Sequence, residues 1–196
     1  FILGQWAQAE GRVYDFFSPE MVGKAPESCE KWYISCDYGT VNPTSMGLWG
    51  LCGGVWYRVK EFYYDSRREG RQKTDAEYVR DLRALCGGKR VERVIVDPSA
   101  ASFLAALRKA GFPVKAADNR VLDGIRVTAG MLREGGIVIC RGCTDCLREM
   151  ELYCWESGKE APRKENDHAM DELRYFAMDL QREERRFAAT FVERRA

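Results

Sequence analysis

The chain has 196 residues, of which 45% are hydrophobic and 31% are charged, and its formal net charge is +1. This length suits one domain with a sizeable core, and the composition is typical of a globular protein. The charge excludes a uniformly basic nucleic-acid-binding protein, but not a local basic face around an acidic pocket. No apolar run approaches the roughly 20 residues of a membrane-spanning helix. The start, FILGQW, has no Met and no basic leader, so we expect a piece of a longer protein without a signal peptide.

The first half of the chain predicts a lead-in segment, three strands and a helix. Residues 1–30 are punctuated by Gly and Pro, which favours irregular structure. The turn Cys52-Gly53-Gly54 predicts a hairpin between the second and third strands. Thr74 and Glu77 have capping-box spacing, so a helix is expected from there to the glycine pair at 87–88. The predicted strands are Lys31–Cys36, Ser45–Leu51 and Val55–Tyr64.

The second half alternates between strands and helices. The β-branched run Val91–Val96 predicts a strand, and Ser99 is the expected cap of the helix that follows, through Ala110. Gln181–Ala196 is rich in Arg and Glu and predicts a frayed, charged tail. A hairpin followed by strand–helix alternation predicts an α/β domain with a mixed sheet flanked by helices. The other expected elements are strands Pro113–Ala116 and Ile137–Cys140 and helices Leu122–Leu132, Thr144–Trp155 and Asp167–Leu180.

Two acidic residues follow predicted strands directly. Asp37 ends the first strand and Asp97 ends the run at 91–96. Because ligands of open α/β sheets bind at the carboxyl ends of the strands, neighbouring parallel strands would bring both acids to one pocket. Two carboxylates that close would repel unless a cation lay between them, and hard oxygen ligands suit Mg²⁺ or Mn²⁺.

The last predicted helix offers a third acid. His168 and Asp171 lie three residues apart and share a helical face, whereas Asp167 stands at the helix start and is the expected cap. Each residue alone also has an ordinary structural interpretation: Asp37 and Asp97 as turn residues, Asp171 as a solvated helix charge, and His168 as a satisfied or exposed histidine. Only their order and placement together indicate a metal site.

The eight cysteines do not suit a disulfide framework, because the chain is neither small nor rich in loops. Several stand in apolar patterns, where a free thiol behaves as a small hydrophobic group. Cys140, Cys143 and Cys146 resemble half of a zinc site, which usually needs four ligands. We therefore favour structural thiols in a reduced, intracellular protein, with zinc as a minor alternative.

Several segments together resemble the C-terminal nuclease domain of the large terminase subunit of tailed double-stranded DNA bacteriophages, in the PBSX-like branch of the RNase H-like superfamily. These segments are ISCDYGTVNPTSMGLWG, GRQKTDAEYVRDL, VIVDPSAASF, NRVLDGI and NDHAMDELRYFAMD. The opening LGQWAQAEGRVYDFF is similar to the segment that follows the ATPase domain in that family. The resemblance covers about residues 1–180.

The resemblance implies an RNase H-like fold and an endonuclease that cuts concatemeric phage DNA with two Mg²⁺ or Mn²⁺ ions per site. Position by position it implies Asp37, Asp97 and Asp171 as metal ligands and catalytic residues, with His168 beside them. It also implies partners: double-stranded DNA, an ATPase motor domain in the full-length protein, the portal and the small terminase subunit, all in the host cytoplasm. The phosphate-binding motif G-x-x-x-x-G-K-[ST] is missing from the chain, so no ATP hydrolysis is expected from it. The implied division is a lead-in at 1–30, a nuclease domain at 31–180 and a tail at 181–196.

Three basic residues precede the last helix, Lys159, Arg163 and Lys164, and we expect either contacts to the DNA backbone or a solvated loop. Two other functions stay open because a fold does not determine a function. One is a Holliday-junction resolvase or transposase-like nuclease, which would prefer branched DNA. The other is a non-catalytic packaging-assembly module, whose thermal stability would not respond to metal.

Overall fold

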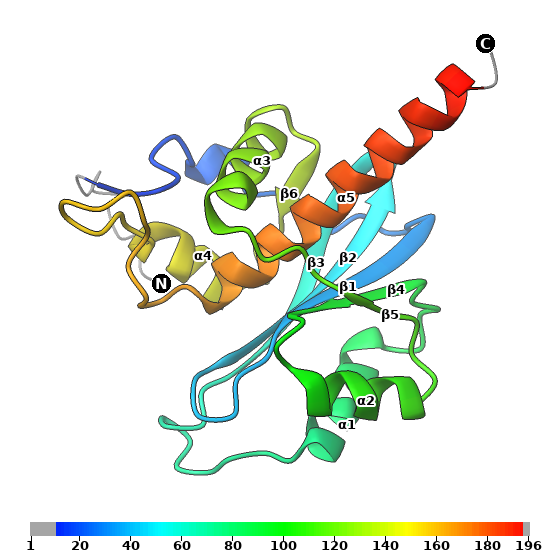
Figure 1. Cartoon of the computed structure of the whole chain (residues 1–196), viewed down its shortest axis with the longest axis vertical. Helices are drawn as coiled ribbons and strands as arrows, with labels where there is room; N and C mark the ends of the chain where they lie inside the picture. The colour runs from blue at the N-terminus through cyan, green and yellow to red at the C-terminus, as the bar shows by residue number, and fades with distance from the viewer. Residues whose placement is uncertain (1–10, 194–196) are drawn as a thin grey trace.

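The computed structural model describes residues 11–193, with side chains described as far as Arg186. Its centre is one six-stranded sheet with the strand order β5-β4-β1-β2-β3-β6 (Figure 1). The strands are β1 (Lys31–Asp37), β2 (Thr44–Cys52), β3 (Val55–Tyr64), β4 (Arg93–Val96), β5 (Val114–Ala116) and β6 (Ile137–Ile139). Every strand predicted from the sequence is present, with ends within two residues of the expected ones.

The sheet is mixed, as the sequence predicts. β1, β2 and β3 run antiparallel to one another in order, and the glycine turn joins β2 to β3. β4 lies parallel to β1 with Cys36 opposite Val96, and β5 and β6 extend the two edges in parallel. This register places the ends of β1 and β4, and therefore Asp37 and Asp97, side by side at one edge of the sheet.

Helices cover both faces of the sheet (Figure 1). Alternate residues of the strands supply two separate cores: Ile34 and Cys36 belong to the core beneath α1 and α2, whereas Tyr33 belongs to the core beneath the other three helices. This alternation is the period-2 pattern of strands that are buried on both sides. The helices are α1 (Asp75–Cys86), α2 (Ala101–Lys109), α3 (Val121–Arg133), α4 (Thr144–Leu152) and α5 (His168–Glu193).

The capping prediction is confirmed for α1 and wrong for α2. The Thr74 hydroxyl accepts a hydrogen bond from the Glu77 backbone, and the Glu77 carboxylate accepts one from the Thr74 backbone. At α2 the residue before the helix is Ala100, which has no side-chain cap. Ser99 is instead held by Asp97, whose carboxylate accepts a hydrogen bond from the Ser99 backbone at 2.6 Å. The side chain of Asp97, and not that of Ser99, therefore stabilises the turn before α2.

The ends of α4 and α5 also differ from the expectation. α4 stops at Leu152 because Cys154 and Trp155 form β-bridges, Cys154 with Arg12 of the lead-in segment. α5 continues through Gln181 to Glu193, so the prediction of a frayed tail is wrong for that stretch; residues 194–196 lie outside the described part.

The described part of the lead-in segment, residues 11–30, packs on the domain. Its one regular element is a short 3-10 helix at Pro19–Met21. Tyr14 and Phe17 are buried in the core beneath α3, α4 and α5. Residues 1–10 lie outside the described part.

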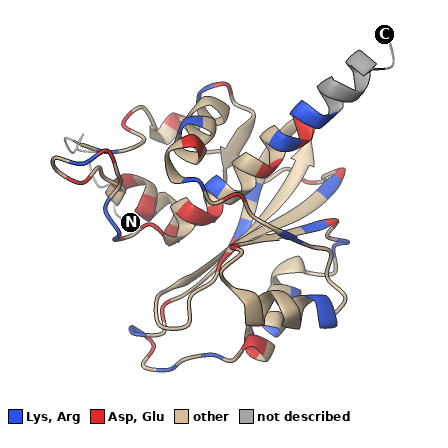
Figure 2. Ribbon diagram, in the orientation of Figure 1, with Lys and Arg blue, Asp and Glu red and all other residues tan. Residues whose placement is uncertain are grey.

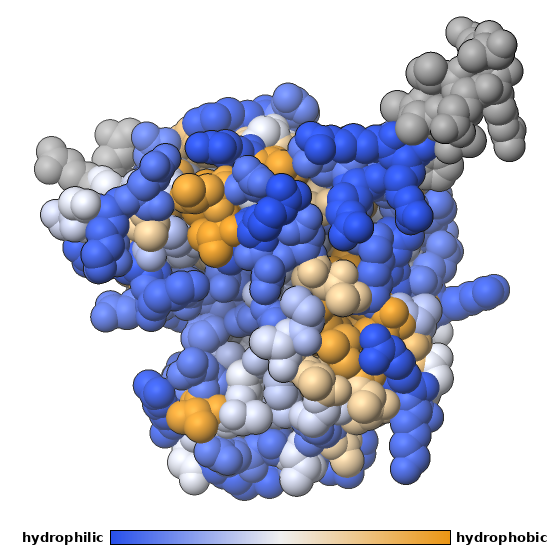
Figure 3. All heavy atoms as spheres, viewed as in Figure 1, coloured by the Kyte–Doolittle hydropathy of each residue, from blue (hydrophilic) through white to orange (hydrophobic). Residues whose placement is uncertain are grey.

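Most of the face seen in Figure 3 is hydrophilic, with apolar side chains gathered over α3 and around α2 and β5. Among the described helices, none combines the length and the apolarity needed to cross a membrane.

Candidate active site

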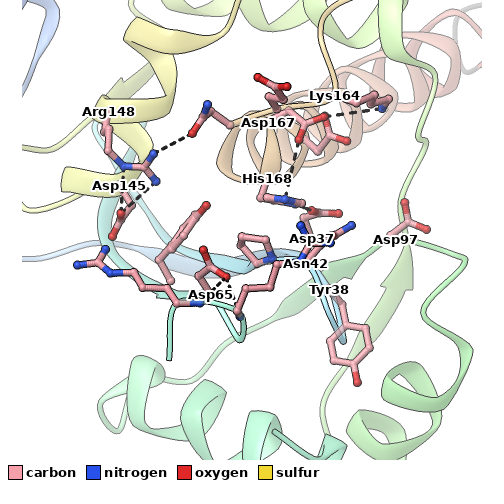
Figure 4. Close-up of a pocket in the computed structure, with 18 of the residues that line it drawn as sticks. Asp37, Tyr38, Asn42, Asp65, Asp97, Asp145, Arg148, Lys164, Asp167 and His168 are labelled. Carbon is pink, nitrogen blue, oxygen red and sulfur yellow. Dashed lines mark hydrogen bonds and ion pairs between the residues drawn. The ribbon is translucent and has the colours of Figure 1, made fainter. Parts of the chain in front are cut away.

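A cavity of about 820 Å³ opens at the carboxyl ends of β1 and β4 (Figure 4). Asp37 ends β1, Asp97 follows β4, and His168 and Asp171 come from the first turn of α5; all four side chains line this cavity. Figure 2 shows further acidic positions, in red, on α4 and along the start of α5. The fold thus brings the four residues singled out in the sequence to one place.

Asp37 and His168 contact each other directly. His168 Nδ1 lies 3.0 Å from Asp37 Oδ2, and both side chains are mostly buried. Burial raises the pKa of Asp37 to about 6; the hydrogen bond to His168 opposes this rise, and the charges of Asp171 and Asp97 add to it. Burial alone would lower the pKa of His168, but the bond to Asp37 raises it above its ordinary value. Negative charge at Asp37 is therefore costly and would be relieved by a cation.

Tyr175 joins the two strand-end acids, and sequence reasoning missed it. Its hydroxyl donates to Asp97 Oδ2 at 2.7 Å and lies 3.5 Å from Asp37 Oδ1. Burial would raise the pKa of Asp97, but hydrogen bonds from Ser99 and Tyr175 bring it below its ordinary value. Tyr175 stands seven residues after His168, so helical periodicity places it on the same face and could have identified it.

Asp171 and Asp167 have different partners. Asp171 Oδ1 accepts a hydrogen bond from Arg174 NH2 at 2.5 Å. Asp167 directly precedes α5, its carbonyl accepts the Asp171 backbone N–H, and its carboxylate lies 3.9 Å from Lys164 Nζ. Burial raises the pKa of Asp167, and the Asp171 charge adds to this. Asp167 is thus a further, largely buried carboxylate at the cavity, which Asp65, Glu69, Asp145 and Glu165 also line.

Of the three basic residues singled out before α5, only Lys164 lines the cavity. Lys159 is exposed and pairs with Glu156 at 2.7 Å, and Arg163 is exposed away from the cavity. Arg67 and Arg68, from the loop after β3, and Arg148, from α4, complete the basic rim. The charged loop at 67–73 is visible in the sequence. Because it lies far from Asp37 along the chain, the sequence does not indicate that Arg67 and Arg68 line the same cavity as Asp37.

Divalent metal suits this site by donor type. Among the side chains described, at residues 11–186, no three His, Cys, Asp or Glu side chains converge in a geometry ready to hold a metal ion, and Asp37, Asp97 and Asp171 are each turned to a protein partner. These three carboxylates nevertheless line one cavity together with Asp167, and carboxylate oxygens are the ligands preferred by Mg²⁺ and Mn²⁺. The residues therefore fit such an ion chemically, with rotation of their side chains.

The cysteines are all free thiols. Cys143 and Cys146 lie in the core beneath α3, α4 and α5, and the Cys143 thiol donates to the Arg58 carbonyl at 3.1 Å. Since no metal cluster of the described residues includes them, the structure gives no support to the zinc alternative. Burial raises the pKa of Cys140 to about 12 and that of Cys143 to about 11, and it raises those of Cys36 and Cys146 well above the ordinary value.

Thiol alkylation checks this description. Because the thiolate is the reactive form, we expect iodoacetamide at pH 8 to leave Cys36, Cys140, Cys143 and Cys146 unmodified in the folded protein. All eight cysteines should react after denaturation in urea. Mass spectrometry of tryptic peptides measures each position, and the half-buried Cys52 and Cys154 are internal references. Modification of Cys143 or Cys146 as fast as Cys52 would contradict the structure.

Comparison with known proteins finds one curated relative and several similar structures, and no family model matches the chain. The large terminase subunit of Escherichia phage T5 is 25% identical over 195 residues, which cover 88% of this chain and 43% of the relative. The large terminase of a thermophilic bacteriophage, solved in complex with ADP, is 48% identical with a TM-score of 0.83; the match covers 90% of this chain and 46% of that one. The chain therefore spans less than half the length of these relatives.

Two isolated domains match over nearly their whole length. The nuclease domain of the P22 large terminase has a TM-score of 0.72 at 17% identity, with 89% of this chain and 95% of the other covered. The nuclease domain of the SPP1 large terminase, solved with bound Mn, has a TM-score of 0.57 at 17% identity, with 80% and 94% covered. At such identity the likeness concerns the fold, which is the RNase H-like fold expected from the sequence. The PBSX-like branch stays a prediction. By sequence the chain is a homologue of bacteriophage large terminase subunits and matches less than half of their length, and its fold is that of the nuclease domains of the P22 and SPP1 large terminases.

Proposed function

We propose that this chain is the metal-dependent endonuclease domain of a phage packaging terminase, which cuts concatemeric double-stranded DNA. The observation that carries the proposal is the meeting of Asp37, Asp97, His168 and Asp171 in one cavity, from three separate parts of the chain. The proposed relation to the full-length protein is a lead-in at 1–30 that follows an ATPase domain, and a nuclease domain at 31–180. The portal and the small terminase subunit would be partners of the whole protein, in the host cytoplasm.

The proposed roles follow from the contacts. Asp37, Asp97 and Asp171 would hold two Mg²⁺ or Mn²⁺ ions. Such ions, when bound, supply a hydroxide nucleophile and stabilise the leaving oxygen of a phosphodiester. His168, held by Asp37, would orient a water molecule or accept its proton. Tyr175 would keep the carboxylates of Asp97 and Asp37 in place, because its hydroxyl lies within reach of both.

The basic rim would hold the DNA backbone. Lys164 comes from the loop before α5, Arg148 from α4, and Arg67 and Arg68 from the loop after β3, and all four line the cavity. Cations from three separate segments suit a substrate that carries phosphates on either side of the cut bond, and such contacts carry no sequence information. We therefore propose non-specific cleavage, with Lys159 and Arg163 removed from the contact set because they lie outside the cavity.

Nicking of supercoiled plasmid tests the proposal. We expect relaxed and linear products with Mn²⁺ or Mg²⁺, none with EDTA, and recovery when Mn²⁺ is returned in excess. Gel analysis over time measures the rates, and linear and four-way-junction DNA are compared in the same series. A strong preference for the junction would favour the resolvase alternative. Absence of both nicking and any Mn²⁺-dependent thermal shift would favour the assembly-module alternative.

A further inference from the structure

A cluster of buried polar groups lies behind Asp171. Among the described residues, most of the buried side-chain polar atoms without a hydrogen-bond partner belong to four side chains. These atoms are Tyr14 OH, Tyr153 OH, Thr128 Oγ1, and Nε and NH1 of Arg174. All four side chains are essentially inaccessible to solvent. Buried groups of this kind are costly unless they are hydrogen-bonded, so their concentration at one place needs a reason.

The four side chains come from four segments that meet at α5. The rings of Tyr14, from the lead-in segment, and Tyr153, at the end of α4, lie 6.0 Å apart. Thr128 belongs to α3 and lies close enough to Tyr14 to act on its pKa. Burial raises the pKa of both tyrosines, and the charge of Arg174 opposes the rise at each. The positive charge of Arg174 therefore acts on both hydroxyls.

Arg174 is held tightly on its remaining sides. A methyl group added at Gly124 of α3 would come within 3.3 Å of the Arg174 side chain, so the helix backbone packs directly against it. NH2 of Arg174 donates to Asp171 Oδ1, whereas Nε and NH1 have no partner. One edge of the guanidinium therefore meets a cavity acid, and the rest is buried without a hydrogen bond to the described residues.

The energetic balance explains such an arrangement. Removing a guanidinium from water costs several kcal/mol, and a single carboxylate leaves most of its five N–H donors unsatisfied. Buried polar groups of this kind are often bridged by ordered water, which makes about three hydrogen bonds to otherwise unsatisfied groups. Tyr14, Tyr153 and Thr128 offer hydroxyl oxygens that can accept from the guanidinium through such water.

We propose that Arg174 is a positioning residue for Asp171, and that the hydroxyls of Tyr14 and Tyr153 fix the guanidinium in its place. The inference rests on the proposed function, since it treats Asp171 as a metal ligand. Groups that orient metal ligands from behind typically affect metal affinity or activity by about 10- to 100-fold. Arg174 would act only through Asp171, and Tyr14 and Tyr153 only through Arg174.

Calorimetric titration of the protein with MnCl₂ in the absence of DNA tests this inference. The variants are Arg174→Lys, the double variant Tyr14→Phe with Tyr153→Phe, and the reference Asp171→Ala. Tyr57→Phe is the matched control, because its hydroxyl makes no hydrogen bond to the described residues and it lies near β6, away from the cavity. Circular dichroism and thermal unfolding without metal establish that each variant is folded.

We expect Arg174→Lys to weaken Mn²⁺ binding about tenfold, and the double tyrosine variant to weaken it in the same direction. Plasmid nicking by both should be restored by raised MnCl₂, whereas loss of stability alone would not respond in this way. If Arg174→Lys does not fold, the double variant decides, since it removes two oxygen atoms and no charge. Wild-type affinity in the folded double variant together with a weakened Asp171→Ala overturns this inference and leaves the proposed function standing. Absence of Mn²⁺ binding by the unmutated protein overturns both.

Discussion

Replacement of Asp37 by asparagine is expected to lower metal-dependent plasmid nicking by about 100-fold or more. A bound metal ion contributes several kcal/mol to stabilising the transition state, and each 1.4 kcal/mol corresponds to a factor of about ten in rate. Asn has nearly the same size as Asp and keeps one oxygen facing His168, but it lacks the charge that would hold a cation. Asp97→Asn should show the same loss. Initial nicking rates at saturating Mn²⁺ measure both.

The same substitution should raise the thermal stability of the metal-free protein or leave it unchanged. Asp37 is a buried acid whose pKa is raised to about 6. Because folding raises the pKa of Asp37, the contribution of this residue to stability is fully present below its unfolded-state pKa near 4. That contribution is lost as the pH rises through about 6. At pH 8 the asparagine avoids that cost, although it forfeits the attraction between Asp37 and a charged His168. Thermal unfolding at pH 5 and pH 8 therefore separates a loss of chemistry from a loss of fold.

Asp123→Asn is the matched control, because Asp123 is a half-exposed acid on α3 whose ion-pair partners among the described residues are Arg120 and Arg126. It should nick plasmid at the unmutated rate. Equal nicking by the Asp37→Asn and Asp123→Asn proteins would show that the strand-end acid is not part of the catalytic site.

The sheet and the positions of the acids could be predicted because both depend on local patterns. Alternation of buried residues, the glycine turn after β2 and the capping box at Thr74 act over a few residues, and the structure follows each of them. Parallel pairing of β1 with β4 then brings Asp37 and Asp97 together, without any further information. The length of α5 was missed because polar residues after Leu180 give no apolar stripe, although Arg and Glu are good helix formers.

What could not be predicted depends on contacts between distant segments. Arg58 stands on the buried face of β3, two residues after Trp56, where the alternating pattern calls for an apolar side chain. The buried charge of Arg58 is tolerated only because it pairs with Glu172 of α5, which stands more than a hundred residues later in the chain. Sequence reasoning noticed Asp171 and overlooked Glu172, since neighbouring acids on a helix differ only in the face that they occupy. The same limit hid Tyr14 and its relation to Arg174.

Replacement of Glu172 by alanine is expected to destabilise the fold by about 3–5 kcal/mol, which is typical for breaking a buried ion pair. Arg58 Nε and NH2 donate to Glu172 Oε2 at 3.1 and 2.6 Å, and Trp49 and Ser35 donate to Oε1. Neither member of the pair is exposed. The backbone of β2 packs closely against this ion pair, because a methyl group at Gly47 would come within 2.6 Å of Arg58 Nε. The variant leaves a buried guanidinium whose remaining carboxylate partner is Glu61.

Urea unfolding followed by circular dichroism measures this loss, and Glu156→Ala is its matched control. Glu156 pairs with Lys159 at 2.7 Å, but both side chains are exposed, so water replaces the lost partner and the expected change is at most about 1 kcal/mol. The loss of stability for Glu172→Gln should lie between those for Glu172→Ala and Glu156→Ala. The glutamine amide keeps an oxygen that can accept from Arg58, but it carries no negative charge. Because a domain of this size is stable by only about 5–15 kcal/mol, the alanine variant should lose about a fifth or more of the total. A cost for Glu172→Ala no larger than that for Glu156→Ala would mean that Arg58 finds water or another acceptor, and that the junction of β3 with α5 is held by its apolar contacts alone.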